Sequence, residues 1–255
     1  MPAKFRFLTL ATLTTAILLL ANCANTAPSP DILRIGVTAD SPPMIFKSGG
    51  QITGLEADMG QALAAEMGKS ARFVNMSWNR LLPSLQAGKI DIIMSNMTIT
   101  EERRMYADFT TPYLQVGKTI LVRSSEYNFY RDPKIIALVD KKIGVEAGTT
   151  SDAFAGRYCP RAPRVELPPS QAIQALNSGK IDVYLHDSPI IWSLSVQGAS
   201  QGVTKIPKTL TQENLGWAVR RGDSTLLSKA NATIAKWKKN GQLESFANRW
   251  MPLTR

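Results

Sequence analysis

Two clusters of polar residues follow short apolar stretches, at places where side chains able to bind a small molecule are expected. The first is Ser95-Asn96-Met97-Thr98, which comes after the apolar run 90–94. The second is His186-Asp187-Ser188, which comes after the apolar run 181–185. If both runs are strands of parallel sheets, these clusters lie at the carboxyl ends of the strands, where open sheets bind their ligands. Hydroxyl, amide and carboxylate groups there predict a site for a polar or charged molecule.

Few residues are suited to catalysis or to metal binding. The sequence has one histidine and two cysteines, too few for a Cys/His zinc site, and contains neither G-x-S-x-G nor H-E-x-x-H. Glu146 and His186 are the only candidates for an acid or a base near such a site. We therefore expect no catalytic residues, no metal and no cofactor.

A hidden duplication predicts two similar α/β units. Residues 85–91, LQAGKID, match residues 176–182, LNSGKID, and upstream residues 35–39 match residues 143–147 in the same order. In each unit a helix should end at the glycine of the repeat, which can adopt the left-handed conformation of a helix C-terminus, and a strand should follow. A strand, a helix and a strand in this order pair in parallel through a right-handed crossover.

The other apolar patterns place the remaining elements. Strands are expected at residues 33–37, 71–74, 90–94, 116–122, 142–145, 181–185 and 215–219, and helices at 54–67, 78–87, 170–178, 223–239 and 242–250. Because the chain leaves the first unit near residues 122–124 and can return near Asn214, the last two helices should belong to the first unit. This predicts an α/β protein of two lobes, each an open and mostly parallel sheet flanked by helices, joined by two hinge strands. Lobe 1 would comprise residues 31–122 and 214–255, and lobe 2 residues 123–213; a tandem arrangement with a third, small C-terminal piece is the alternative.

The composition agrees with a folded chain of one or two domains. Of the 255 residues, 44% are hydrophobic and 20% are charged, which is too apolar for a disordered protein. The formal net charge of +10 would suggest a nucleic-acid partner, but the basic residues are dispersed along the chain. We therefore expect no binding to nucleic acid.

The first thirty residues have the layout of an export signal. Lys4 and Arg6 precede an uncharged apolar run, residues 7–21, and small polar residues follow up to residue 30. The apolar run is shorter than the roughly 20 residues of a membrane-spanning helix. Residues 1–22 are therefore predicted to be a signal peptide, and residues 23–30 a tether.

A lipid anchor is predicted at Cys23. Leu20-Ala21-Asn22-Cys23 resembles a bacterial lipobox, in which the cysteine becomes the lipid-modified first residue of the mature chain. Asn22 stands where glycine or alanine is usual, so that a simple cleaved signal is the alternative. The second cysteine, Cys159, is then expected to be a buried thiol.

The mature chain resembles the family 3 periplasmic solute-binding proteins of ABC importers for polar amino acids. The motifs that carry the resemblance are Gly54, Glu56-Ala57-Asp58, Trp78, Leu82-Pro83, Leu85, residues 88–91, residues 97–103, Phe109, Pro112-Tyr113, residues 148–151, His186-Asp187 and residues 215–219. Together they cover about residues 32–250. The resemblance implies the type II periplasmic-binding-protein fold, with two lobes that close on a ligand at a hinge. It also implies a monomeric receptor at the extracytoplasmic face of the membrane, which delivers an L-amino acid to the membrane subunits of an ABC importer.

The resemblance also implies which residues hold the backbone of the amino acid. Arg103 resembles the residue that binds the α-carboxylate, and Asp187 the one that accepts the ammonium group. Both roles suit these groups, because guanidinium and carboxylate form two-pronged charge-assisted contacts. Asn96 and Thr98 would add contacts from the first lobe. From the second lobe, Gly148, Thr149 and Thr150 would begin a helix whose N-terminus favours an anion.

Side-chain selectivity is assigned to three further positions, Trp78, Ser41 and Glu146, and Asp40 beside them is expected to be a turn residue rather than a contact. Trp78 falls where the family places an apolar or aromatic wall, whereas Ser41 replaces a common aromatic residue. Glu146 points toward the cleft in the family, and Asp40 lies in the corresponding loop of the other unit. These acidic residues favour a ligand with a polar or cationic side chain.

Several alternatives remain beside these assignments. Asp187 could instead cap the helix that begins at Ser188, and Glu146 could be a surface charge. Relatives of this fold include a cyclohexadienyl dehydratase, so an enzyme that uses Glu146 and His186 is a second possible function. A ligand sensor that acts on a partner in trans is a third.

Overall fold

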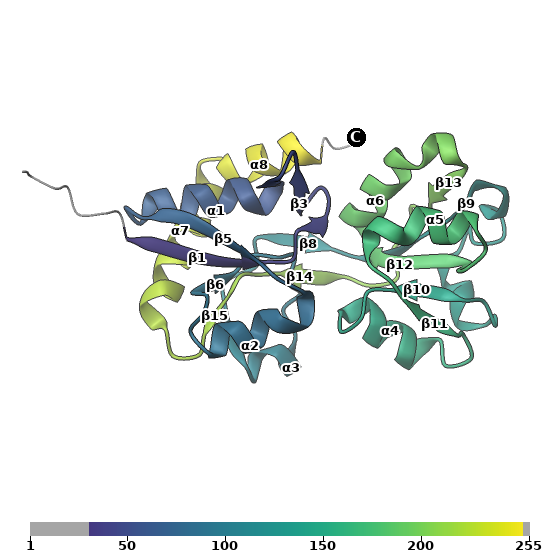
Figure 1. The fold of residues 1–255 in the computed structure, drawn as a ribbon, viewed down its shortest axis with the longest axis horizontal. Helices are drawn as coiled ribbons and strands as arrows, with labels where there is room; N and C mark the ends of the chain where they lie inside the picture. The colour runs from purple at the N-terminus through teal and green to yellow at the C-terminus, as the bar shows by residue number, and fades with distance from the viewer. Residues whose placement is uncertain (1–30, 252–255) are drawn as a thin grey trace, which may run out of the picture.

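The chain forms two lobes, each built around a five-stranded sheet (Figure 1). The structure, a computed structural model, describes residues 31–251; the predicted signal, tether and lipid site lie outside them. The sheet of lobe 1 has the order β5 (Ser70–Asn75), β1 (Ile32–Val37), β6 (Ile92–Ile93), β15 (Ala218–Arg220) and β7 (Ala107–Phe109). Strand β1 pairs in parallel with β5 and β6, and β15 runs antiparallel to its neighbours.

Lobe 2 repeats this plan. Its sheet has the order β11 (Arg164–Glu166), β10 (Ile143–Val145), β12 (Val183–Asp187), β9 (Lys118–Arg123) and β13 (Val203–Lys205). Strand β10 pairs in parallel with β11 and β12, whereas β9 runs antiparallel to β12 and β13. The predicted fold of two α/β lobes is confirmed.

Helices cover both sheets. Lobe 1 carries α1 (Leu55–Glu66), α2 (Leu81–Gln86), α3 (Glu101–Arg104), α7 (Ser224–Lys239) and α8 (Gln242–Trp250), and lobe 2 carries α4 (Thr150–Tyr158), α5 (Ala172–Asn177) and α6 (Ser188–Gln197). Helices α7 and α8 pack against α1, so the C-terminal segment returns to the first lobe as predicted (Figure 1). The tandem arrangement is therefore wrong. Within residues 31–251, no helix has the length and apolar character needed to cross a membrane.

The duplication in the sequence has a structural counterpart in the packing of each lobe. Gly36 in β1 lies against Ile90, and Gly144 in β10 lies against Ile181, so closely that an added Cβ would come within 2.2 and 2.7 Å of the isoleucine side chains. Gly88 follows α2 in lobe 1, and Gly179 follows α5 in lobe 2. Both glycines have a left-handed backbone, with φ angles of 67° and 69°. The same helix end therefore recurs in the two halves, as the repeated GKID sequence predicts.

Two short strands join the lobes. They are β8 (Leu114–Val116) and β14 (Glu213–Leu215), which pair antiparallel between the two large sheets (Figure 1). The strand predicted at residues 116–122 is therefore two strands that meet at Gly117, and β9 belongs to lobe 2. The lobe boundary predicted between residues 122 and 123 is corrected to Gly117. The position of the boundary depends on which sheet each strand joins, and the apolar pattern continues without a break across Gly117.

Other differences are local. The helix predicted at residues 78–87 begins with a 3₁₀ turn, Trp78–Arg80, and the strand predicted at 215–219 is divided between β14 and β15. A small antiparallel sheet of β2 (Asp40–Ser41), β3 (Ile45–Ser48) and β4 (Gln51–Thr53) adds to lobe 1.

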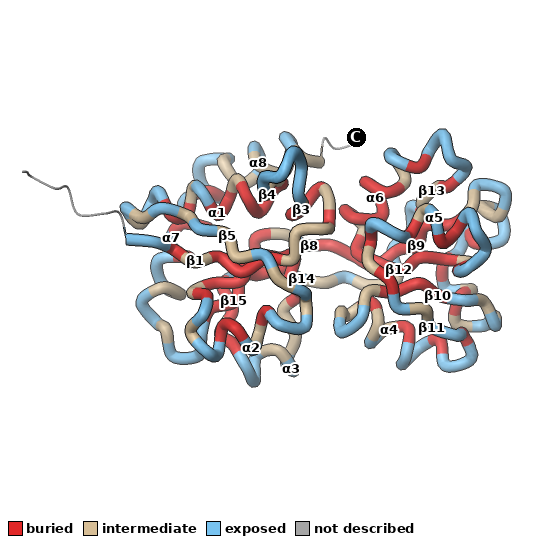
Figure 2. Tube along the Cα trace, in the orientation of Figure 1, coloured by how far each residue is buried: buried red, intermediate tan, exposed pale blue. Residues whose placement is uncertain are grey.

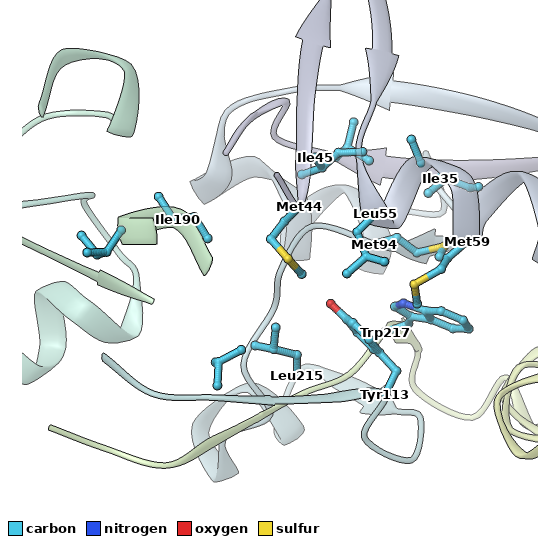
Figure 3. Packing of buried hydrophobic residues seen from close by; sticks show 14 of the residues in the cluster. Ile35, Met44, Ile45, Leu55, Met59, Met94, Tyr113, Ile190, Leu215 and Trp217 are labelled. Carbon is cyan, nitrogen blue, oxygen red and sulfur yellow. The ribbon is translucent and has the colours of Figure 1, made fainter. Parts of the chain in front are cut away.

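The interior of each lobe is apolar, and exposed residues lie mainly on the helices and loops (Figure 2). In lobe 1 the core extends from α1 to the hinge, where Leu55 and Met59 lie near Tyr113 and Trp217 (Figure 3). Tyr113 and Trp217 stack, with ring centroids 5.6 Å apart. Cys159 is a buried free thiol in the core of lobe 2, as predicted.

Candidate ligand-binding site

A narrow cleft lies between the lobes. Lobe 1 lines it with Thr38, Ser41, Trp78, Ser95, Asn96, Thr98 and Arg103, and lobe 2 with Glu146, Thr149, Thr150, Ser151, His186 and Asp187. Trp78 is the only one of these without a hydroxyl, amide, imidazole or charged group in its side chain. Such a lining suits a small, strongly polar ligand.

Asp187 ends strand β12, and its carboxylate lies in the cleft. The residue occupies the N-cap position of α6, but its side chain makes no capping hydrogen bond. Instead its carboxylate accepts hydrogen bonds from Lys118 Nζ and from Asn96 Nδ2, each at 3.0 Å. Burial alone would raise the pKa of Asp187, but Lys118, His186 and these bonds hold it below its ordinary value. Asp187 is therefore a buried anion in the cleft, and the capping alternative does not describe its side chain.

Arg103 faces the same cleft from lobe 1. Thr100 is the N-cap of helix α3, and its hydroxyl accepts from the Arg103 backbone N–H at 3.1 Å. The Arg103 guanidinium donates to the Thr98 carbonyl at 2.9 Å and lies over the Trp78 ring, 5.1 Å from its centroid. Among residues 31–251, its other guanidinium N–H groups have no hydrogen-bond partner. Burial lowers the pKa of Arg103, and Asp187 and Glu213 oppose this shift. The cation therefore has donors to offer to an anionic group.

The N-terminus of α4 approaches the cleft from lobe 2. Thr149 is its N-cap, and its hydroxyl accepts from the Asp152 N–H at 3.3 Å and donates to the Glu146 carbonyl at 2.7 Å. The Thr150 hydroxyl lies 3.4 Å from that of Thr98. The Thr149 hydroxyl thus shapes the helix start, while Thr150 lies between the two lobes.

Lys118 is a central member of the site that the sequence patterns did not indicate. Its side chain is 1% exposed, and its ammonium nitrogen lies 3.0 Å from Asp187, 2.7 Å from Thr150 Oγ1 and 3.1 Å from Glu213. Lys118 is the first residue of β9, directly after the hinge. Its ion pairs link Asp187 of lobe 2 to Glu213 of β14. The sequence does carry a signal for this residue, because a lysine stands near the start of the otherwise apolar stretch 116–122. The prediction of one uninterrupted strand over that stretch did not use it. Thr38 is a further lining residue not singled out from the sequence, whereas Ser95 and Ser151 belong to segments named there without a role of their own.

One end of the cleft is acidic. Glu146 Oε2 lies 3.3 Å from His186 Nε2. The other nitrogen, Nδ1, accepts from the Asp187 backbone N–H at 2.8 Å, so a neutral ring carries its proton on Nε2 and donates it to Glu146. Burial, and next the charge of Glu146, raise the pKa of Asp40 to about 6, and the Ser41 hydroxyl lies 3.2 Å from its carboxylate. Two neighbouring carboxylates, Glu146 and Asp40, make this end of the cleft a site that favours a cation.

In the described part of the chain, three polar contacts join side chains of lobe 1 to lobe 2 across the cleft. Trp78 Nε1 donates to the Gly148 carbonyl at 3.0 Å, Asn96 donates to Asp187, and the hydroxyls of Thr98 and Thr150 approach each other. The structure therefore has closed lobes, with donors and acceptors of both halves within reach of one small molecule.

The structure brings nearly all the predicted ligand-binding residues together. Arg103, Asp187, Thr98, Asn96, Thr149, Thr150, Trp78, Glu146 and Ser41 line the cleft. Gly148 does not line it, and instead accepts the Trp78 hydrogen bond. Asp40 lies at an adjoining opening with Trp78 and Glu146. Which of these residues contact a ligand stays a prediction.

Comparisons with known proteins agree with this architecture. The profile of the bacterial extracellular solute-binding proteins, family 3, matches residues 33–253. The L-arginine-binding protein of Pseudomonas aeruginosa is 34% identical over 228 residues, which cover 86% of this chain and 87% of that protein.

Solved structures are similar over the same range. An ancestral arginine-binding protein bound to arginine superposes with a TM-score of 0.80 at 32% identity, over 88% of this chain and 99% of that one. An ancestral amino acid-binding protein described as a precursor of cyclohexadienyl dehydratase has a TM-score of 0.79 at 36% identity, over 86% and 95% of the two chains. With its two lobes, two hinge strands and polar cleft, the chain belongs to the family 3 bacterial extracellular solute-binding proteins.

Proposed function

We propose that this protein is an extracytoplasmic receptor that binds an L-amino acid, preferably one with a cationic side chain, and delivers it to an ABC importer. The observation that carries the proposal is the presence of Arg103 from lobe 1 and the ionised Asp187 from lobe 2 in one cleft. These opposite charges on opposite walls match the carboxylate and the ammonium group of a zwitterion. The arginine-binding relatives support the same ligand class.

The proposed pose follows from the donors and acceptors of the cleft. The α-carboxylate binds the Arg103 guanidinium, with Thr98 and the N-terminus of α4 beside it. The α-ammonium binds Asp187, whose two oxygens can accept more hydrogen bonds than the two that they receive. The side chain then extends toward Glu146 and Asp40, where a guanidinium or an ammonium group compensates their charge.

Closure of the lobes is the signal in this proposal. A ligand that contacts both walls favours the closed form over the open one, because half of its contacts exist only when the lobes meet. The membrane subunits of the importer would then recognise the closed form. We propose that the receptor acts as a monomer.

A thermal-shift screen of the mature protein against the L-amino acids tests the ligand class. L-Arginine and L-lysine should raise the melting temperature in proportion to the logarithm of their concentration, as expected for ligands that bind the folded state. D-Arginine is the matched control, because it presents the same groups in the wrong arrangement. If no L-amino acid raises the melting temperature, the proposed ligand class is wrong.

A second candidate function is a dehydratase acting on prephenate or arogenate. It is favoured by the contact of His186 with Glu146 inside the cleft, a pair that could exchange a proton with a bound substrate. The relative described as a precursor of cyclohexadienyl dehydratase gives it further support. Turnover by purified protein that Glu146→Gln abolishes would favour the enzyme. Absence of turnover at high protein concentration would exclude it.

We further propose that Cys23 carries a lipid that anchors the receptor to the membrane. The lipobox-like sequence before this cysteine supports the proposal, as does the export layout of the first thirty residues. Cys23→Ala should move the protein from the membrane to the soluble fraction and lower its mass by the weight of the lipid. An unchanged distribution and an unchanged lipid mass would contradict lipidation.

A further inference from the structure

Glu56 is a fully buried carboxylate behind the ligand cleft, and none of the roles proposed above uses it. It lies in the first turn of α1, with 0% of its surface exposed, and is absent from the lining of the cleft. Its carboxylate accepts a hydrogen bond from the Tyr113 hydroxyl at 2.8 Å, and its second oxygen accepts from the backbone N–H of Asn96. A buried carboxylate is costly unless donors satisfy it, so these two bonds define its place.

The backbone at Asn96 needs such support. With a φ angle of 55°, Asn96 is the only residue other than glycine with a left-handed backbone among residues 31–251. This conformation is uncommon for a residue with a side chain and persists where the surroundings hold it. The turn brings the Asn96 side-chain amide into the cleft, where it donates to Asp187 across the lobes.

The oxygen of that amide, Asn96 Oδ1, is buried and is left without a protein partner in the described part of the chain. A buried acceptor without a partner is unfavourable, and a donor group of a bound molecule would satisfy it. The Asn96 turn therefore matters both for lobe contact and for the binding of an ammonium group near Asp187.

Tyr113 ties the same carboxylate to the hinge. This residue directly precedes β8, and its backbone N–H donates to the Leu215 carbonyl in β14 at 3.0 Å. Its ring belongs to the core of lobe 1, near Leu55 and Met94 (Figure 3). Glu56 thus joins three parts of the molecule: the start of α1, the Asn96 turn and the hinge.

We propose that Glu56 is a positioning residue for ligand binding, which holds the left-handed turn at Asn96 and thereby sets the Asn96 amide against Asp187 in the closed form. Glu56 touches no ligand and acts through Asn96. The inference rests on the proposed function only where ligand affinity is the readout.

Four variants separate this role from a general effect on folding. Glu56→Leu removes the acceptor, while Glu56→Gln keeps an oxygen for the Asn96 N–H and an amide for the Tyr113 hydroxyl. Asp58→Leu is the matched control, because Asp58 lies in the same turn of α1 but accepts from Trp250 Nε1 at 2.8 Å, away from Asn96. Asn96→Gly removes the amide and adopts the left-handed conformation freely.

The first measurement needs no ligand. Amide hydrogen exchange, followed residue by residue by NMR, should be faster at Asn96 and Met97 in Glu56→Leu, by about tenfold or more relative to the amides of β1 and β5. Glu56→Gln and Asp58→Leu should leave this ratio near that of the wild type. If Glu56→Leu speeds exchange equally throughout lobe 1, or not at all at Asn96, the positioning role is wrong.

The second measurement is the Kd for L-arginine by calorimetry. Glu56→Leu should raise Kd about tenfold or more above the wild-type value, and Glu56→Gln should stay within about threefold of that value. In an Asn96→Gly background, the further substitution Glu56→Leu should change Kd little. Equal effects of Glu56→Leu with and without the Asn96 side chain would overturn the proposal. Should Glu56→Leu not fold, Glu56→Asp replaces it with the same expectations, because its carboxylate is one methylene short of Asn96.

The two proposals fail in distinguishable ways. If wild-type protein binds no L-amino acid, the proposed function fails, while the exchange ratio at Asn96 still decides the role of Glu56. If wild-type protein binds L-arginine and the Glu56→Leu variant has wild-type affinity and exchange, only the positioning role fails.

Discussion

The guanidinium of Arg103 lies over the indole of Trp78, with 5.1 Å between its central carbon and the ring centroid. Stacking on an aromatic face fixes the plane of a guanidinium and keeps its edge N–H groups available. The indole itself is held by its hydrogen bond to Gly148 in the other lobe. The anion-binding group of lobe 1 is therefore oriented by a side chain that also contacts lobe 2.

Loss of the Arg103 side chain should abolish most ligand binding. Arg103→Ala removes the charge partner of the α-carboxylate, and we expect a loss of about 2 to 5 kcal/mol in binding free energy, measured by calorimetry with L-arginine. The neighbouring Arg104, whose side chain is 47% exposed, is the matched control. Equal affinities of the Arg103→Ala and Arg104→Ala variants would refute the assigned role.

Trp78→Phe tests the contact between the lobes. The phenyl ring keeps an aromatic face for Arg103 but cannot donate to the Gly148 carbonyl, so ligand affinity should fall by about 0.5 to 1.5 kcal/mol. Trp192→Phe, in α6, serves as the control because this residue does not line the cleft. Should Trp78→Phe bind L-arginine as tightly as the wild type, the indole hydrogen bond does not contribute to closure.

Replacement of Lys118 should reduce stability more than any surface substitution in lobe 2. Lys118→Met leaves Asp187 and Glu213 without their buried cation, and we expect the free energy of unfolding to fall by about 3 to 5 kcal/mol. Urea denaturation measures this, with the exposed Lys180→Met variant as the control, expected within about 0.5 kcal/mol of the wild type. A Lys118→Met protein of unchanged stability would show that these carboxylates do not depend on the lysine.

Affinity for a cationic amino acid should depend on pH through Asp40. Burial and the charge of Glu146 raise the pKa of free Asp40 to about 6, and a bound cation would lower it again, so binding releases a proton below that pH. The Kd for L-arginine should therefore worsen by up to about fivefold between pH 6 and pH 5, and change little through Asp40 above pH 7.

Two comparisons isolate that effect. Asp40→Asn should flatten the pH dependence of Kd between pH 5 and pH 6. Glu56, whose pKa is raised by burial to about 7, is present in both proteins, so its titration does not contribute to the difference between them. L-Glutamine, which has no charged side chain, should show a weaker dependence than L-arginine. The same slope for wild type and Asp40→Asn would rule out Asp40 as the responsible group.

The fold was largely predictable because its signals are local or repeated. The glycines at 88 and 179 end a helix in each lobe, and the amphipathic patterns of α7 and α8 gave their bounds almost to the residue. The break at Gly117 was missed because it depends on which sheet each half of the apolar stretch joins. No pattern within residues 116–122 records that choice.

The site was predictable where a residue lies at a strand end. Asn96 and Asp187 follow apolar strands of the two repeats, and their contact across the cleft follows from the topology. Lys118 was missed because its partners, Asp187 and Glu213, come from distant parts of the chain and meet only in the folded protein. The same holds for Glu56, whose link to Asn96 joins residues forty positions apart.

A crystal structure of the mature protein with L-arginine bound would test the proposed site. We expect a two-pronged contact of the α-carboxylate with Arg103, a contact of the α-ammonium with Asp187, and a guanidinium that extends toward Glu146 and Asp40. A ligand whose carboxylate and ammonium groups avoid both Arg103 and Asp187, or that lies outside the cleft, would contradict the proposed site.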